Sequence, residues 1–189
     1  MRWIGKMAAV LAVLIVIVAA AGCGGERQDD AQEEIGWRTL SLPQDDGRSL
    51  SLELPGELEV QQERSDDANV KNQKIYKHLG SRMLVSIHHG TMINPNVRVK
   101  FTMSRFLDDF AKVRKNNPVL KRAEKRTING REMDYFEIGL RDEDGDSLRL
   151  ECLGLQMGQE YWMITFGYWT DDKTMEAIAE KAMASIRIE

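Results

Sequence analysis

Alternating apolar and polar positions predict strands in the first half of the chain. Between residues 49 and 54, leucine occupies every second position, which is the pattern of a half-buried strand, and Pro55-Gly56 ends it. Residues 37–42 are expected to pair with this strand through a turn at Asp45-Asp46-Gly47. Residues 74–78 and 82–89 flank Gly80 and predict a second hairpin, in which Met83, Val85 and Ile87 lie on one face.

Short turn sequences delimit three further strands. Each is predicted directly after a turn, at residues 131–141 after Asn129-Gly130, at 147–157 after Asp144-Gly145, and at 161–169 after Gly158. Connections this short favour an antiparallel meander. The last of these strands carries aromatic residues on both faces, which is typical of a central core strand.

Two segments have apolar residues at helical spacing. A helix is predicted between Thr102 and Asn117, ended by Pro118, and a second is expected near the C-terminus, capped by Thr170 or Asp171. The first carries Met103, Phe106, Leu107, Phe110 and Val113 on one face. These elements predict an α+β fold, with an antiparallel sheet of about six to eight strands and two main helices.

The N-terminal segment has the composition of a targeting signal. Arg2 and Lys6 precede an apolar run from residue 7 to residue 21, which is shorter than the roughly 20 residues that a spanning helix needs. The following residues Ala20-Ala21-Gly22-Cys23 resemble the lipobox of bacterial lipoproteins. This resemblance implies diacylation of Cys23 and cleavage before it. An uncleaved membrane anchor or a plain secretory signal is the alternative.

The sequence therefore divides into three parts. Residues 1–22 are expected to be a lipoprotein signal peptide, and residues 23–36 a lipidated cysteine followed by an acidic, flexible tether. Residues 37–189 are expected to form a single domain. Two acyl chains give stable membrane residence, so this organisation predicts an extracytoplasmic protein anchored to the bacterial cell membrane or outer membrane.

The domain also resembles a known fold family. The order of its elements, together with Leu54-Pro55, Asn129-Gly130-Arg131 and Ser185-Ile186, resembles the PsbP-like α/β/α sandwich family. This resemblance implies a small accessory or binding domain, often exported or lipid-anchored in bacteria and usually without known enzymatic activity.

The sequence contains few residues suited to catalysis or metal binding. Cys152 lies in a predicted apolar strand and is expected to be a core residue, whereas His88 and His89 are adjacent in a strand and must point to opposite faces. The acidic run at residues 142–146 lacks the spacing of a calcium loop and favours a hairpin turn. We therefore expect no catalytic residue, no metal site and no cofactor.

Charge is unevenly distributed along the chain. Residues 26–67 carry four basic and thirteen acidic residues, residues 70–131 carry fifteen and three, and residues 132–189 carry five and fourteen. The blocks have net charges of −9, +12 and −9. Near Pro118, the middle block contains Lys112, Arg114, Lys115, Lys121, Arg122, Lys125 and Arg126.

These seven residues form the candidate binding patch. An electropositive surface would meet anionic lipid headgroups, an acidic wall polymer or an acidic protein, whereas export disfavours nucleic acid. Two structural explanations stay open: the cations complement the end of the preceding helix, or the acidic blocks fold alongside and neutralise them. The sequence favours a non-enzymatic envelope binding or accessory module, with an envelope hydrolase lacking a known motif as the alternative.

Overall fold

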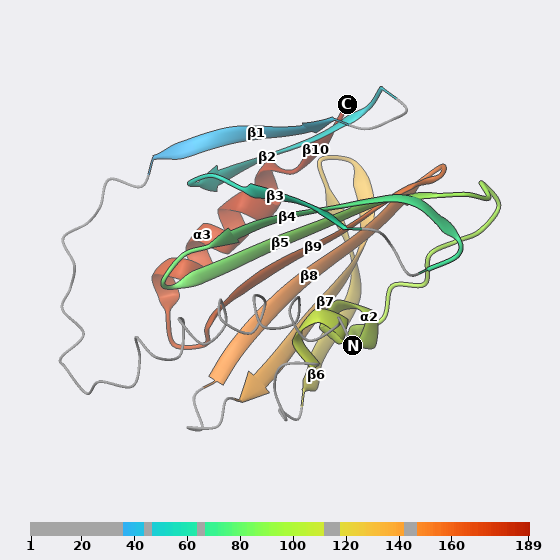
Figure 1. Cartoon of the computed structure of the whole chain (residues 1–189). Helices are drawn as coiled ribbons and strands as arrows, with labels where there is room; N and C mark the ends of the chain where they lie inside the picture. The colour runs from blue at the N-terminus through green and yellow to red at the C-terminus, as the bar shows by residue number, and fades with distance from the viewer. Residues whose placement is uncertain (1–35, 44–46, 64–66, 112–117, 142–146) are drawn as a thin grey trace, which may run out of the picture. The chain divides into compact units, whose positions relative to one another are not determined.

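The computed structural model describes residues 36–43, 47–63, 67–111, 118–141 and 147–189. Within them, two helices and ten strands form a unit that extends from Gly36 to Glu189 (Figure 1). The elements are β1 (Trp37–Pro43), β2 (Ser49–Pro55), β3 (Glu59–Glu63), β4 (Val70–Leu79), β5 (Met83–Met92), α2 (Met103–Ala111), β6 (Val119–Ile128), β7 (Arg131–Arg141), β8 (Ser147–Met157), β9 (Glu160–Trp169), α3 (Lys173–Ser185) and β10 (Arg187–Ile188).

The strands form two antiparallel sheets. The larger sheet has seven strands in the order β3-β4-β5-β9-β8-β7-β6, and the smaller has three in the order β1-β2-β10. Strands β6, β7, β8 and β9 follow one another in both sequence and space, which confirms the predicted meander. The predicted α+β class with an antiparallel sheet and two main helices is likewise confirmed for the described residues.

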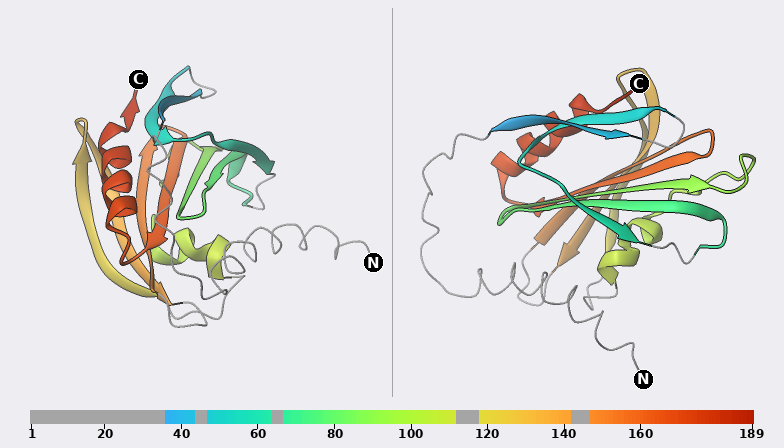
Figure 2. Two further views of the ribbon diagram at one scale, coloured as in Figure 1. Left: turned by 90° about the vertical axis from the view of Figure 1, so that its left-hand side faces the viewer. Right: turned by 45° about the horizontal axis from the view of Figure 1, so that its top comes forward.

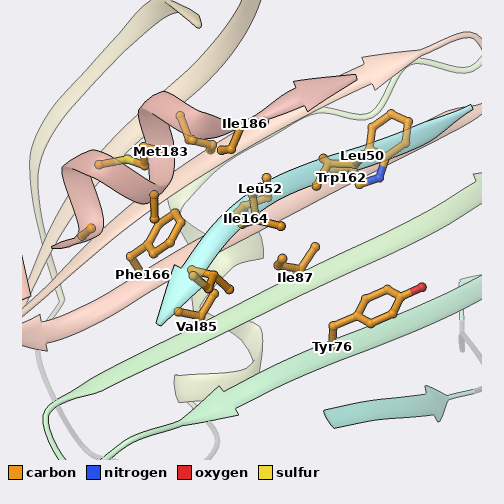
Figure 3. Close-up of a cluster of buried hydrophobic side chains, with 14 of the residues drawn as sticks. Leu50, Leu52, Tyr76, Val85, Ile87, Trp162, Ile164, Phe166, Met183 and Ile186 are labelled. Atoms are coloured by element: carbon orange, nitrogen blue, oxygen red, sulfur yellow. The ribbon is translucent and has the colours of Figure 1, made fainter. Parts of the chain in front are cut away.

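Each face of the seven-stranded sheet has its own hydrophobic core. One face packs against α3 and β2, and the other packs against α2 through Phe106 and Leu107 (Figure 2). Successive side chains of a strand point to opposite faces, so β8 and β9 contribute to both cores. Figure 3 shows the first core, where β2, β5, β9 and α3 contribute Leu50, Leu52, Val85, Ile87, Ile164, Phe166 and Met183, and Ile186 follows directly after α3.

The sequence located most of the buried strands. Strands β7 and β8 have the predicted bounds, and β2 alternates buried and half-buried residues as expected. Strands β4 and β5 are each longer than predicted, although they pair as a hairpin around Gly80. Helix α2 is described to Ala111, and the predicted continuation to Asn117 lies outside the described residues, as do the turns at 44–46 and 142–146.

Three strands and one helix cap differ from the expectations. No pattern in the sequence predicts β3, β6 or β10. The cap expected at Thr170 or Asp171 for the C-terminal helix is wrong: the N-cap of α3 is Asp172, whose carboxylate accepts a hydrogen bond from the Met175 amide. Residues 169–172 instead form a turn, in which the Asp172 amide donates to the Trp169 carbonyl at 3.0 Å.

The turn between β6 and β7 is fixed to the end of α3. Asn129 and Gly130 both have positive φ values, 47° and 78°, which suit the tight hairpin connection predicted for Asn-Gly. The Asn129 side-chain amide donates to the carbonyls of Ala184 and Ile186 at 2.9 and 2.7 Å. This contact secures the last residues of β6 although the strand lies at the edge of the sheet.

Candidate functional site

The candidate site is β6, an edge strand of the seven-stranded sheet. It has ten residues and pairs with β7, its only neighbour among the described strands. Every residue from Val119 to Lys125 is exposed, and the register shifts by a bulge between Leu120 and Arg122. Exposed edge strands often carry charged residues and bulges because these discourage aggregation, so charge at this position has a structural use of its own.

The structure places four of the seven predicted patch residues on this strand. Lys112, Arg114 and Lys115 lie outside the described residues. The other four are Lys121, Arg122, Lys125 and Arg126. The sequence predicts that these four lie around the end of the preceding helix. This prediction is wrong: they lie within strand β6, so the helix dipole does not explain them.

The basic side chains project from both faces of β6. Arg122 and Arg126 lie on the same face as Glu124, and Lys125 lies on the opposite face, because side chains alternate along a strand. The side chains of Arg122 and Lys125 are 55% and 56% exposed, whereas that of Arg126 is 31% exposed. The structure thus brings the four residues onto one edge and divides them between two faces.

Carboxylates of the acidic C-terminal block lie beside these cations. The Lys125 ammonium is 3.0 Å from Asp134 and 3.6 Å from Glu132, and Arg122 is 3.9 Å from Glu137. The hydrogen bond to Asp134 raises the pKa of Lys125, with the charges of Asp134 and Glu132 adding to the effect. Part of the basic charge is therefore paired, as the alternative explanation expected.

Exposed pairs of this kind hold their partners weakly. Surface ion pairs contribute about 0 to 1 kcal/mol in water, because the charges stay solvated and the side chains lose freedom. An incoming anionic group can therefore share or replace the carboxylates of β7 at little cost. Lys121 forms no ion pair with any described residue, and its stem lies over Gly139.

Arg126 links the edge to a buried polar cluster that the sequence pattern does not predict. Its guanidinium lies 3.3 Å from the centroid of the Tyr135 ring. The hydroxyls of Tyr135 and Tyr168 donate to the two carboxylate oxygens of Glu151 at 2.7 and 3.0 Å. Burial raises the pKa of both tyrosines, and their hydrogen bonds to Glu151 add to this. The available signal was Glu151 itself, a lone carboxylate within the apolar strand β8.

Among the described residues, the one cysteine is buried and His78 contacts the backbone. Cys152 is fully buried, and burial raises its thiol pKa to about 12, so its predicted role as a core residue is confirmed. His78 lies 2.9 Å from the carbonyl of Glu57 through its Nδ1 atom. No group of three or more potential ligands capable of holding a metal ion occurs in the described part of the chain.

His88 and His89 point to opposite faces of β5, as predicted from their adjacency. Nε2 of His88 lies 3.1 Å from the Ser86 hydroxyl, whereas Nε2 of His89 lies 2.5 Å from Oε2 of Glu160. Thr91 donates to the same Glu160 oxygen at 3.0 Å. His89, Glu160 and Thr91 are all less than a tenth exposed, so substrate does not reach this cluster.

Comparisons with known proteins show the fold. The chain resembles the solution structure of CyanoP, the cyanobacterial PsbP of Synechocystis sp. PCC 6803, with a TM-score of 0.53 and 12% identity over 87% of this chain and 100% of that chain. This likeness confirms the PsbP-like fold and, at such low identity, shows nothing beyond the fold. No model of a protein family matches the sequence, and no curated protein matches it.

Two further solved structures have lower scores. A protein of unknown function from Pseudomonas aeruginosa has a TM-score of 0.41 and 15% identity over 78% of this chain and 95% of that chain. LpqN, described as involved in cell envelope biogenesis of Mycobacterium tuberculosis, has a TM-score of 0.41 and 11% identity over 80% and 91%. Scores at this level support no conclusion about this chain.

Among the described residues, no helix is long and apolar enough to cross a bilayer.

Proposed function

We propose that the protein is a lipid-anchored accessory module of the bacterial envelope, which binds an anionic partner through β6 and catalyses no reaction. The observation that carries the proposal is the exposed edge strand with four basic residues. This edge belongs to a domain whose fold is shared with CyanoP. Anionic lipid, an acidic wall polymer and an acidic protein are the partner classes that suit such a surface.

The lipid anchor is supported by the sequence Ala20-Ala21-Gly22-Cys23 and by the acidic segment that follows it. Diacylation would hold the domain at a membrane surface, where weak contacts act at a high effective concentration. Replacement of the attachment residue, Cys23→Ser, should move the protein from the membrane fraction to the soluble fraction or prevent its processing. Unchanged membrane fractionation and unchanged electrophoretic mobility would contradict the lipid anchor.

The absence of catalysis is supported by the burial of the reactive side chains. Within the described residues, Cys152 is enclosed in the core and the contact between His89 and Glu160 is closed to solvent. A nucleophile needs both substrate access and an activated form, and the raised thiol pKa of Cys152 opposes activation. No specific contact in the described residues favours the alternative of an envelope hydrolase.

Binding through β6 can be tested by removing its charges. The variant K121Q/R122Q/K125Q/R126Q should bind vesicles of anionic phosphatidylglycerol, or an acidic polymer, at least tenfold more weakly than the wild type. The matched control K71Q/K77Q/K100Q/R141Q removes four basic residues elsewhere and should bind as the wild type does. Raised salt should weaken wild-type binding, because screening reduces interactions between exposed charges. Equal binding by both variants would exclude β6 as the anion-binding surface.

A further inference from the structure

The outer edge of β6 is open for backbone pairing. In an antiparallel sheet, alternate backbone N–H and C=O groups of an edge strand point away from their only neighbour. Strand β6 pairs with β7 over its whole length from Val119 to Ile128, and no other described strand covers its second edge. Such an edge can accept an extended polypeptide as an additional strand.

The placement of the charges distinguishes among anionic partners. Arg122 and Arg126 project from one face of the sheet, and Lys125 projects from the other. A flat lipid surface that meets one face does not contact the cation on the opposite face. An extended polypeptide along the edge presents alternate side chains to both faces, so acidic residues in it can reach all three cations.

On the inner side of β6, carboxylates of strand β7 already pair with the basic residues. Lys125 is directly opposite Asp134, and Arg122 is directly opposite Glu137. These two opposed pairs have nitrogen-to-oxygen separations of 3.0 and 3.9 Å. Because more than half of each basic side chain is exposed, an acidic strand on the outer side can provide a second set of carboxylates at comparable positions.

A second copy of this strand is a poor occupant. If two β6 strands paired antiparallel about the centre of the strand, Lys121 would lie opposite Arg126 of the other copy. Arg122 would lie opposite Lys125 in the same arrangement. Like charges directly opposite each other destabilise a strand pair, whereas opposite charges contribute about 0.2 to 1 kcal/mol for each pair. The charge pattern therefore opposes self-association and favours an acidic strand.

We propose that the outer edge of β6 binds an extended acidic segment of a partner polypeptide, which joins the seven-stranded sheet as an eighth strand beyond β6. This inference rests on the proposed function and deepens it, because it assigns the anionic partner to one chemical class. Backbone pairing provides the general affinity, and the cations on both faces select acidic residues whose side chains project to both faces of the added strand.

The test uses a ten-residue peptide in which pairs of adjacent glutamates alternate with pairs of threonines, so that glutamates project to both faces of the strand. The peptide carries a fluorophore, and the protein is the full chain in non-ionic detergent. Fluorescence anisotropy should show binding that is at least tenfold tighter than that of the same peptide methylated on every backbone amide. The methylated peptide keeps all charges and cannot donate backbone hydrogen bonds. The variant K121Q/R122Q/K125Q/R126Q should lose at least tenfold in affinity, and K71Q/K77Q/K100Q/R141Q should not.

Hydrogen exchange provides a second measurement. On addition of the unmethylated peptide, the β6 amides that do not pair with β7 should exchange at least tenfold more slowly, while those of the opposite edge strand β3 should be unchanged. Equal affinity for the methylated peptide, or no slowing in β6, would overturn strand addition.

The outcome separates this inference from the proposed function. If phosphatidylglycerol vesicles bind through the four basic residues and the peptide does not, the inference fails and the proposed function stands. If neither probe binds, both fail. Tight peptide binding that requires free backbone amides and the basic residues of β6 supports both.

Discussion

The guanidinium of Arg126 lies over the ring of Tyr135, at 3.3 Å from the ring centroid, so one basic residue of the β6 edge rests directly on the buried core. The Tyr135 hydroxyl in turn donates to the buried carboxylate of Glu151 at 2.7 Å. No such stacking links Arg122 to a ring of the described residues. The four cations of β6 are thus unequal, and a loss of binding in an Arg126 variant needs a parallel measurement of stability.

We predict that Arg126→Gln lowers the free energy of unfolding by about 1 kcal/mol, because a partly buried cation stacked on an aromatic ring contributes roughly this amount. Arg122→Gln is the matched control on the same strand face and should change stability by less than about 0.5 kcal/mol, as for other exposed charges. Urea denaturation of the two variants measures both values. Equal stability of the variants would show that the stacking over Tyr135 contributes nothing.

Tyr135→Phe should destabilise the fold by about 1 to 3 kcal/mol, because it leaves one oxygen of a buried carboxylate without its hydrogen bond. Tyr76→Phe provides the control: Tyr76 is buried in the same core, and its hydroxyl forms no hydrogen bond with a described residue. Its loss should cost less than about 0.5 kcal/mol, since no buried group is deprived of a partner. Comparable losses in the two variants would contradict the importance of the Glu151 contact.

Cys152 should resist thiol reagents in the folded protein at pH 8. Its thiol is fully buried, and burial raises its pKa from 9.0 to about 12, so little thiolate exists and reagents cannot approach it. Below about pH 9 the thiol is protonated in both the folded and the unfolded chain, so stability does not depend on it. As pH rises from about 9 toward about 12 the unfolded chain loses this proton first, and the free energy of unfolding falls. Labelling with Ellman's reagent in the Cys23→Ser background measures reactivity. Rapid labelling without denaturant would contradict a closed core.

The sequence predicted those elements whose residues are buried on at least one face. Strand β2 alternates leucine with polar residues, and β7 and β8 begin after recognisable turns, so periodicity and turn chemistry together located them. Strand β6 has exposed residues on both faces, and its sequence VLKRAEKRTI therefore lacks any apolar period. Strand β3 has a single apolar residue, and β10 has two residues in all, which are too few to define a period.

The sequence predicted the residues of the candidate site but not their arrangement. Charge segregation identified the basic residues, since composition is visible without a fold. It could not show that Arg122 and Lys125 project from opposite faces, or that Asp134 and Glu137 lie beside them, because both depend on the pairing of β6 with β7. The contact between Arg126 and Tyr135 likewise arises from this pairing.

Gly154 leaves space for the ring of Phe101. A Cβ atom at this position in β8 would overlap the Phe101 ring, which packs against the core on the α2 face of the sheet. We expect Gly154→Ala to cost about 1 to 3 kcal/mol, the usual range for an overpacked core. Gly36→Ala is the control, because no atom lies within 4 Å of the added group. In the double variant with Phe101→Ala the two losses should be less than additive, and full additivity would refute the overlap.

At the start of α3, Asp172 caps the helix and also binds the loop that precedes β5. Its carboxylate accepts from the Met175 amide at 3.1 Å, as an N-cap does, and receives two hydrogen bonds of 2.8 Å from Arg82 in the loop before β5. Asp172→Ala removes both interactions and should cost about 1 to 2 kcal/mol. Asp172→Asn keeps an oxygen that can cap the helix and should recover at least half of that loss. Asp171→Ala should be milder than Asp172→Ala, since the cap belongs to the following residue. The opposite ranking in urea denaturation would return the cap to Asp171, one of the two positions expected from the sequence.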